Sequence, residues 1–286
     1  MSDDTLTNES DTFEIGGTSV HRLGFGAMRL CGGAIIGPPD DEEHARKVLE
    51  RAVELGIDFV DTADSYGPGV SERLIGETIG DRDDVLVATK AGLLRNREGD
   101  WIAHGKPEYI RNQVLVSLDR LRTETIDLYQ IHRPDPDVPF EDSVATFAEL
   151  QDDGLVDAIG LSNVSVDQLE TAREHVDVAT VQNRYNVGDR SNAAVLEACE
   201  DHGIGFIPWA PIDADDLAAH GGLIDTIAAN YDVTRRQVAL AWLLERSPVT
   251  CPIPGTSDPA HLEANVAASR LSLSDDEIQR LTDTAR

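Results

Sequence analysis

The run Ile126-Asp-Leu-Tyr-Gln-Ile-His132 is strand-like and ends at an ionisable side chain, a histidine. Two earlier runs end in the same way, Ile57-Asp-Phe-Val-Asp61 at an aspartate and Val85-Leu-Val-Ala-Thr-Lys90 at a lysine, and Tyr66 lies five residues after that aspartate. A parallel α/β barrel builds its active site at the carboxyl ends of its strands. We therefore expect these four side chains to meet at one end of a barrel.

Strand-like and helical segments alternate along most of the chain. Strand-like runs lie near residues 23–28, 57–61, 85–89, 126–131, 156–161, 178–182, 204–209 and 249–253. Amphipathic helical stretches lie near residues 41–55, 70–79, 107–121, 141–152, 165–174, 191–202, 222–246 and 258–268. Eight β-then-α units favour one closed (β/α)8 TIM barrel, although a doubly wound parallel sheet shows the same alternation.

Segments outside these units complete the predicted architecture. A hairpin around a Gly-Gly turn is expected within residues 13–21, before the barrel. Residues 1–11 are predicted to be a disordered acidic tail, and residues 12–286 a single domain, because such barrels commonly have about 250 residues. Two longer connections, residues 92–105 with Trp101 and residues 212–222, are expected on the catalytic face, where loops set substrate choice.

The charge composition excludes several classes of partner. The chain has 24 Lys and Arg against 53 Asp and Glu, a net charge of -29. Such a surface repels nucleic acids and anionic membranes. Only three residues are lysines, and we interpret this lysine-poor, acidic composition as that of a halophilic protein, since salt screens its self-repulsion.

The location is also predicted from composition. The N-terminus is acidic where a signal peptide would be positively charged and then apolar, and no apolar run approaches the roughly 20 residues that span a bilayer. Three cysteines, Cys31, Cys199 and Cys251, form no C-x-x-C pair and suggest a reducing compartment. We expect a cytoplasmic protein that is a monomer or a weak oligomer.

Three of the strand-end residues are suited to proton transfer. A tyrosine hydroxyl has an ordinary pKa of about 10 and needs a nearby cation to become an efficient acid. Lys90 can supply that cation, and Asp61 can compensate the buried charge of Lys90. Any one of these residues alone is more often a surface or capping residue, but together they predict an acidified phenol at Tyr66.

Six motifs resemble those of the aldo-keto reductase family, and the resemblance extends from Phe13 to about Ala268. The acidic composition makes the chain resemble a halophile-like bacterial or archaeal member of that family. The motifs are Asp61-Thr-Ala-Asp-Ser-Tyr66-Gly67, Ala88-Thr-Lys90, Asp127-Leu-Tyr-Gln-Ile-His132-Arg-Pro, Ile159-Gly-Leu-Ser162-Asn163, Val181-Gln182-Asn183 and Pro252-Ile-Pro-Gly-Thr256. The resemblance implies that Asp61, Tyr66, Lys90 and His132 form the catalytic tetrad, with Tyr66 as general acid. A neighbouring His132 can orient a substrate carbonyl by hydrogen bonding.

No metal site is expected, because none of the eight histidines forms an H-x-H or H-E-x-x-H motif.

The resemblance also implies a nicotinamide cofactor, either NADP(H) or NAD(H). Ser162, Asn163 and Gln182 would bind its carboxamide, and Trp209 would stack on its ring. The remaining residues assigned to the cofactor are Gly26, Met28, Gly255, Thr256, His261 and Asn265. Gly255 and His261 stand where mammalian-type members carry a lysine and an arginine for the 2'-phosphate of NADPH, so the preference between the two cofactors stays open.

These features predict an NAD(P)H-dependent oxidoreductase that reduces an aldehyde or ketone to an alcohol. Two alternatives belong to other classes. One is a Schiff-base aldolase acting through Lys90. The other is a non-catalytic, nicotinamide-binding redox sensor similar to the channel-associated members of the family.

Overall fold

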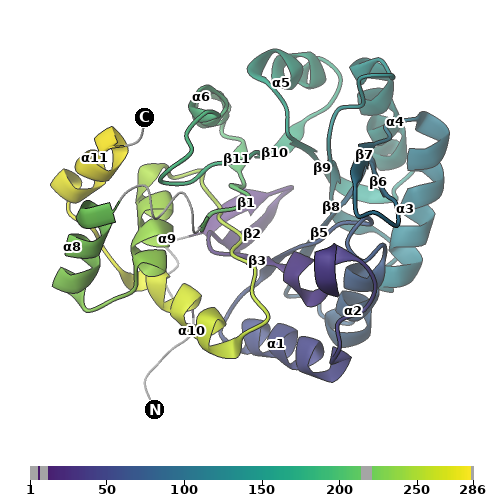
Figure 1. The fold of residues 1–286 in the computed structure, drawn as a ribbon. Coiled ribbons are helices and arrows are strands. Elements are labelled where there is room, and N and C mark those ends of the chain that lie inside the picture. The colour runs from purple at the N-terminus through teal and green to yellow at the C-terminus, as the bar shows by residue number, and fades with distance from the viewer. Residues whose placement is uncertain (1–5, 7–11, 214–220, 285–286) are drawn as a thin grey trace.

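The computed structural model describes residues 6, 12–213 and 221–284. Within these residues, seven parallel strands form one sheet that curls round on itself (Figure 1). In spatial order the strands are β3 (Phe25–Gly26), β4 (Phe59–Asp61), β5 (Leu86–Ala91), β8 (Ile126–Ile131), β9 (Val156–Ser162), β10 (Val178–Gln182) and β11 (Gly205–Phe206). The sequence prediction of a parallel (β/α)8 barrel is confirmed.

The barrel is closed by an extended segment instead of a regular eighth strand. Residues 249–254 bond to one sheet edge through Phe206 N to Val249 O, at 2.8 Å, and through Cys251 N to Phe206 O, at 2.7 Å. On the other edge, Gly24 N donates to Pro252 O at 3.0 Å. The predicted strand at 249–253 lacks a full ladder because prolines at 252 and 254 have no N–H to donate.

Helices surround the barrel on its outer side (Figure 1). They are α1 (Glu42–Glu54), α2 (Val70–Ile79), α3 (Pro107–Leu121), α4 (Phe140–Asp152), α5 (Val166–Arg173), α6 (Ala193–His202), α8 (Gly221–Tyr231), α9 (Arg235–Arg246), α10 (Pro259–Ala267) and α11 (Asp275–Thr284), with short 3-10 turns η2 (Ala27–Leu30), η3 (Gly33–Ile35) and η4 (Ala268–Arg270). The single helix expected at 222–246 is two helices. Asp232 takes a positive φ of 54°, and Thr234 begins α9 with a capping box to Gln237.

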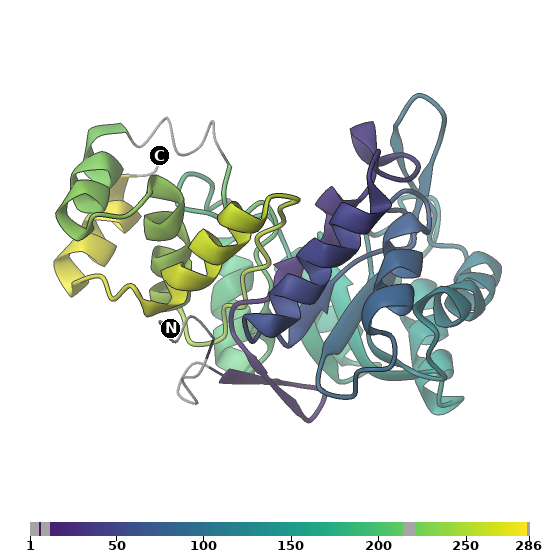
Figure 2. The same cartoon turned by 90° about the horizontal axis from the view of Figure 1, so that it is seen from below.

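The predicted N-terminal hairpin is present and closes one end of the barrel. Strands β1 (Thr12–Ile15) and β2 (Thr18–His21) pair antiparallel around Gly16 and Gly17, whose φ angles of 59° and 86° suit glycine. Its buried Ile15 and Val20 pack into the barrel interior against side chains of four strands and of the closing segments, namely Phe59, Leu86, Ala88, Leu128, Ala158, Ile207, Cys251 and Ile253. Figure 2 shows this hairpin along the lower edge of the molecule.

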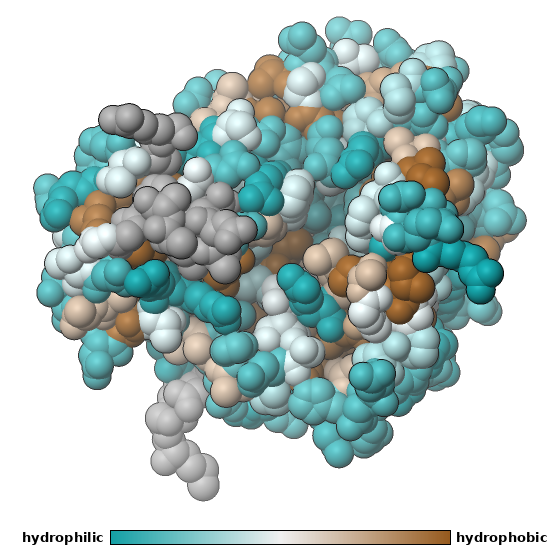
Figure 3. All heavy atoms as spheres, in the orientation of Figure 1, coloured by the Kyte–Doolittle hydropathy of each residue, from teal (hydrophilic) through white to brown (hydrophobic). Residues whose placement is uncertain are grey.

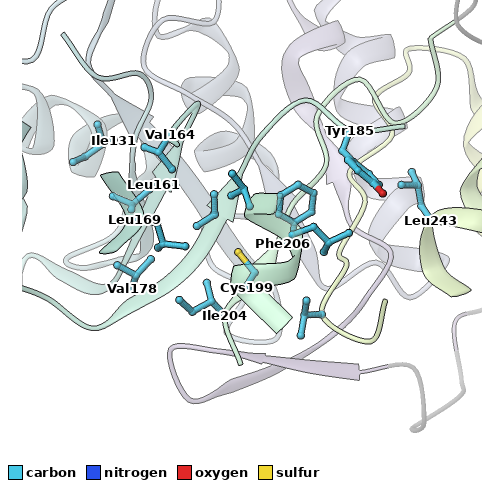
Figure 4. Packing of buried hydrophobic residues seen from close by; sticks show 14 of the residues in the cluster. Ile131, Leu161, Val164, Leu169, Val178, Tyr185, Cys199, Ile204, Phe206 and Leu243 are labelled. Carbon is cyan, nitrogen blue, oxygen red and sulfur yellow. The ribbon is translucent and has the colours of Figure 1, made fainter. Parts of the chain in front are cut away.

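A second apolar layer lies between the strands and the outer helices. Figure 4 shows part of it, where Leu161, Val178 and Phe206 from three strands meet Leu169 of α5 and Cys199 of α6. These side chains are buried, and each contributes about 1.5–3 kcal/mol by leaving water. This packing holds the strand ends in fixed positions.

The connection at 92–105 is a second hairpin, at the opposite end of the barrel from the first (Figure 2). Strands β6 (Leu93–Arg95) and β7 (Trp101–Ala103) pair antiparallel, with Arg95 opposite Trp101. The other long connection, 212–222, and the acidic tail fall mostly outside the described residues. Leu6 is the described residue of the tail, and its N–H donates to Leu55 O at 2.9 Å.

Candidate active site

Asp61 and Lys90 form a buried ion pair where β4 and β5 end. Lys90 Nζ donates to Asp61 Oδ1 at 2.6 Å and to Thr62 O at 2.7 Å, and both charged side chains are buried. The other carboxylate oxygen, Asp61 Oδ2, accepts from Gln182 at 2.8 Å and from Gln130 at 3.1 Å. A buried pair is stabilised by further hydrogen bonds to its charged groups, and here both oxygens of Asp61 and two of the three donors of Lys90 have partners. The predicted contact between Asp61 and Lys90 is confirmed.

Sequence reasoning gave no role to Gln130. A signal was available, because side chains alternate along a strand and Gln130 therefore shares the inward face of β8 with the position of His132. In the sheet register Gln130 is the direct neighbour of Lys90. This register places its amide beside the ion pair.

Tyr66 lies next to the ion pair, with its ring centroid 5.2 Å from Lys90 Nζ. Burial raises the pKa of Tyr66 well above its ordinary value, and the Asp61 charge raises it further. Burial also lowers the pKa of Lys90, against the opposing effect of Asp61. The expectation of an acidified phenol is wrong in direction, because the loss of hydration and the nearby charge of Asp61 both raise the pKa of Tyr66. Tyr66 therefore keeps its proton at neutral pH.

His132 lies beside Tyr66, with ring centroids 5.8 Å apart and the rings nearly perpendicular. Its Nδ1 is 3.3 Å from Ser65 Oγ. Burial lowers the pKa of His132 well below its ordinary value, and the charges of Lys90 and Arg133 lower it further. The imidazole is therefore neutral, so one of its ring nitrogens donates a hydrogen bond and the other accepts one.

An aromatic and apolar rim surrounds Tyr66 and His132. Trp101 packs edge-on against Tyr66, with ring centroids 6.1 Å apart, and its ring centroid lies 6.3 Å from that of His132. Other side chains packed in this group are Met28, Cys31, Ile35, Ala63 and Val70. Figure 3 shows a hollow near the centre of this face, with hydrophobic residues at its floor. Cofactor-assigned Met28 thus lies in the rim beside Tyr66.

Four of the residues assigned to the nicotinamide lie at the ends of neighbouring strands. Ser162 ends β9 and Gln182 ends β10, and both are buried. Asn163 donates through Nδ2 to His132 O at 2.9 Å and accepts from Trp209 Nε1 at 3.1 Å. Since Gln182 also bonds Asp61, hydrogen bonds link these nicotinamide-assigned residues to Asp61 and to the backbone of His132.

Gly26 and Gly255 bring two backbone segments into contact at the barrel edge. A Cβ on Gly26 would lie 2.6 Å from Ile253 O, and a Cβ on Gly255 would lie 2.6 Å from Gly26 O. Larger residues at either position would push the segments apart. Both predicted cofactor glycines are therefore required by the backbone packing, whatever else they contact.

The other three residues assigned to the cofactor lie at or near α10. Thr256 and Asn265 are buried, whereas His261 is exposed, with Nδ1 3.8 Å from Asp258 Oδ2. Asp258 caps the helix by accepting from Ala260 N at 2.8 Å. These three residues lie on the part of the chain that follows the barrel-closing segment, residues 249–254.

The residues present fit a nicotinamide dinucleotide. Side-chain amides and a hydroxyl, which offer both donors and acceptors, meet an indole at the strand ends beside Tyr66 and His132. A carboxamide needs both kinds of partner, and a flat ring suits an aromatic neighbour.

A second group of buried ionisable residues lies behind Tyr66 and was missed by sequence reasoning. Tyr109 of α3 donates to Asp64 Oδ2 at 2.7 Å. Burial, followed by the charge of Glu72, raises the pKa of Asp64 to about 8. Glu72 is fully buried and accepts from Thr89 at 2.7 Å and from Arg120 at 3.1 Å. Asp64 lies inside the motif that contains Asp61 and Tyr66, but its partners lie far away in the sequence.

Some classes of site are absent from the described residues. No three His, Cys, Asp or Glu side chains in the described ranges lie where they could hold a metal ion. The three cysteines are buried and unpaired. In the part of the chain that the structure covers, no helix is both long and apolar enough to cross a membrane.

Comparisons with known proteins agree with this geometry. Residues 22–286 match the model of the Aldo/keto reductase family. The chain is 42% identical over 279 residues to an uncharacterised oxidoreductase of Schizosaccharomyces pombe, covering 98% of this chain and 91% of that protein. It is 38% identical over 285 residues to pyridoxine 4-dehydrogenase of Escherichia coli, covering 97% and 99%. The solved glycerol dehydrogenase of Gluconobacter oxydans superposes with a TM-score of 0.86 at 28% identity, covering 97% and 95%. The chain therefore belongs to the aldo-keto reductase family and is an NAD(P)H-dependent oxidoreductase that reduces carbonyl groups.

Proposed function

We propose that Tyr66, His132, Lys90 and Asp61 carry out this reduction, with Tyr66 as the proton donor. A nicotinamide bound here would supply the hydride that the carbonyl carbon needs, and Tyr66 transfers its proton to the carbonyl oxygen. His132 holds that oxygen by a hydrogen bond, and Lys90 stabilises the phenolate that forms. The observation that carries the proposal is the position of the buried Tyr66 ring, whose centroid lies 5.2 Å from Lys90 Nζ and 5.8 Å from the centroid of the His132 ring.

The ion pair of Asp61 and Lys90 fits this role better than it fits an aldolase. A Schiff-base lysine must reach the substrate with a free amine. Lys90 is fully buried, and its ammonium donates to two oxygens. The geometry therefore favours electrostatic support of Tyr66 over nucleophilic attack.

The test of the mechanism is Tyr66→Phe. We expect kcat to fall about 10²–10⁴-fold, the usual contribution of a positioned general acid. Cofactor should still bind and quench tryptophan fluorescence, with the quenching lost in a Trp209→Phe control. Turnover near that of the wild type in Tyr66→Phe would refute the role of Tyr66. It would also contradict the redox-sensor alternative, because that alternative is non-catalytic.

We further propose that Ser162, Asn163, Gln182 and Trp209 bind the nicotinamide end of the cofactor, and that Gly26, Met28, Gly255, Thr256, His261 and Asn265 contact the rest. Support comes from the hydrogen bonds that link Asn163 and Gln182 to the tetrad strands. Titration of wild type and of Gln182→Ala with NADPH and with NADH measures both the contact and the preference. Equal affinity of the variant and the wild type would contradict this assignment.

The substrate that we propose is an aromatic aldehyde of the pyridoxal type. Support comes from the similarity to a pyridoxine 4-dehydrogenase and from the aromatic rim formed by Trp101, Tyr66 and His132. A panel of aldehydes, ketones and alcohols, run with each cofactor in molar KCl, tests the proposal. A preference for polyols would contradict it.

We also propose that residues 12–286 fold as one domain, monomeric or weakly associated, in a reducing and salt-rich cytoplasm without nucleic-acid or membrane partners. The support is the net charge of -29 and the three unpaired cysteines. One cooperative unfolding transition is expected, with a melting temperature that rises from dilute to molar KCl because salt screens like charges. A melting temperature that falls with salt would oppose the halophilic interpretation.

A further inference from the structure

Arg95, at the end of β6, joins two loops at the barrel mouth. Its guanidinium donates to the carbonyl oxygens of Gly99, at 2.9 Å, and Asp100, at 3.2 Å, within the turn of its own hairpin. It also donates to Ala34 O at 2.8 Å and to Ile35 O at 3.2 Å, some 60 residues earlier in the chain. The fork geometry of arginine allows one side chain to hold four carbonyls, which a lysine ammonium cannot do.

The same guanidinium covers a face of Trp101. The guanidinium carbon of Arg95, Cζ, lies 3.5 Å from the centroid of the indole, within the range of a strong cation–π contact. The two residues are direct partners in the β6 to β7 register. Trp101 also contacts Tyr66 and His132, so Arg95 fixes the ring that borders the proposed catalytic groups.

The loop that Arg95 holds is strained and also contacts the segment of Tyr66. Ala34 and Ile35 have φ angles of 56° and 59°, and such values are unusual for a β-branched residue like isoleucine. Ile35 O also accepts from Gly67 N at 3.2 Å, and Gly37 N donates to Gly67 O at 2.9 Å. A strained loop persists only where its surroundings hold it, and Arg95 provides part of that support.

We propose that Arg95 is a positioning residue that holds Trp101 as one wall of the carbonyl pocket, and that this wall selects flat aromatic carbonyl compounds over small polyhydroxylated ones. The inference rests on the proposed function. An aromatic substrate gains contact with the indole, whereas hydroxyl groups placed against it lose water without gaining a partner. The neighbouring Met28, Cys31 and Ala63 add apolar surface on the same rim.

The experiment compares kcat and KM of Arg95→Met for benzaldehyde and for glyceraldehyde. We expect the ratio of kcat/KM for benzaldehyde to that for glyceraldehyde to fall about tenfold, mainly through KM, as for the loss of one aromatic contact. Arg97→Met is the matched control, because Arg97 is an exposed arginine of the same hairpin. Its ratio should equal that of the wild type.

Trp101→Ala provides an independent measurement should Arg95→Met fail to fold. It should lower the same ratio, and the double variant should lower it no further than Trp101→Ala alone, because Arg95 acts through Trp101. Equal losses on both substrates, or an unchanged ratio in either single variant, would overturn the proposal. Failure of the proposed substrate class is distinguishable, since the wild type itself would then show no preference for benzaldehyde over glyceraldehyde.

Discussion

Two antiparallel hairpins lie at opposite ends of the same barrel and differ in what they bring there (Figure 2). The β1–β2 hairpin inserts Ile15 and Val20 into the apolar interior. The β6–β7 hairpin places Arg95 and Trp101 beside Tyr66. Similar local structure therefore serves stability at one end and selection of substrate at the other, because the four proposed catalytic residues lie at or after the carboxyl ends of parallel strands.

The largest effect is expected from removing the Lys90 cation, at the end of the barrel that carries Tyr66. Lys90→Met should reduce kcat about 10²–10⁴-fold, since Tyr66 would lose the charge that stabilises its phenolate. Lys47→Met, at an exposed lysine paired with Glu43, is the control and should leave kcat unchanged. Steady-state kinetics on both variants measure the difference. A kcat within a few-fold of the wild type in Lys90→Met would place the proton chemistry elsewhere.

At the end of the barrel that carries the β1–β2 hairpin, a substitution should lower stability and leave catalysis unchanged. Ile15→Ala leaves a cavity in the barrel interior and should lower the free energy of unfolding by about 2–5 kcal/mol. The folded variant should keep its kcat and KM, because Ile15 lies far from the strand ends that carry the tetrad. Urea unfolding and kinetics on one preparation test both parts. A selective loss of kcat would show that the two ends are coupled.

A smaller, pH-dependent effect is expected from Asp64. Its pKa is about 8 in the fold, against 3.8 for the ordinary group, so the folded state holds a proton that the unfolded state releases. Stability should therefore fall as pH rises from about 4 to about 8, by at most about 1.4 kcal/mol per pH unit. Asp64→Asn removes this dependence, and its stability relative to the wild type should increase between pH 5 and pH 8 in urea unfolding.

Tyr109→Phe is the companion variant for that experiment. It removes the hydrogen bond that favours the ionised carboxyl, so the pKa of Asp64 should rise and the loss of stability should continue to higher pH. If Asp64→Asn and the wild type kept a constant difference across this pH range, Asp64 would not be the titrating group.

Much of the architecture followed from local patterns. Strand runs that end at Asp61, Lys90 and His132 predicted which side chains would share one end of the barrel, because side-chain alternation and parallel pairing are set by short segments. The segment at 249–253 deviated because its prolines cannot complete a ladder. The hairpin in 92–105 was missed because its turn, residues 96–100, is longer than the two-residue Asn-Gly or Gly-Gly turns that mark hairpins most clearly.

The sequence alone determined which chemical groups the chain carries and the order in which they occur. That order identified the family and the four proposed catalytic residues. Tertiary structure decided how those groups behave. The pKa of Tyr66 rises because folding removes water from it, which no local pattern reports. Likewise, Tyr109 reaches Asp64 across 45 residues and Arg95 reaches Ala34 across 61, so these partnerships exist only once the barrel has brought distant segments together.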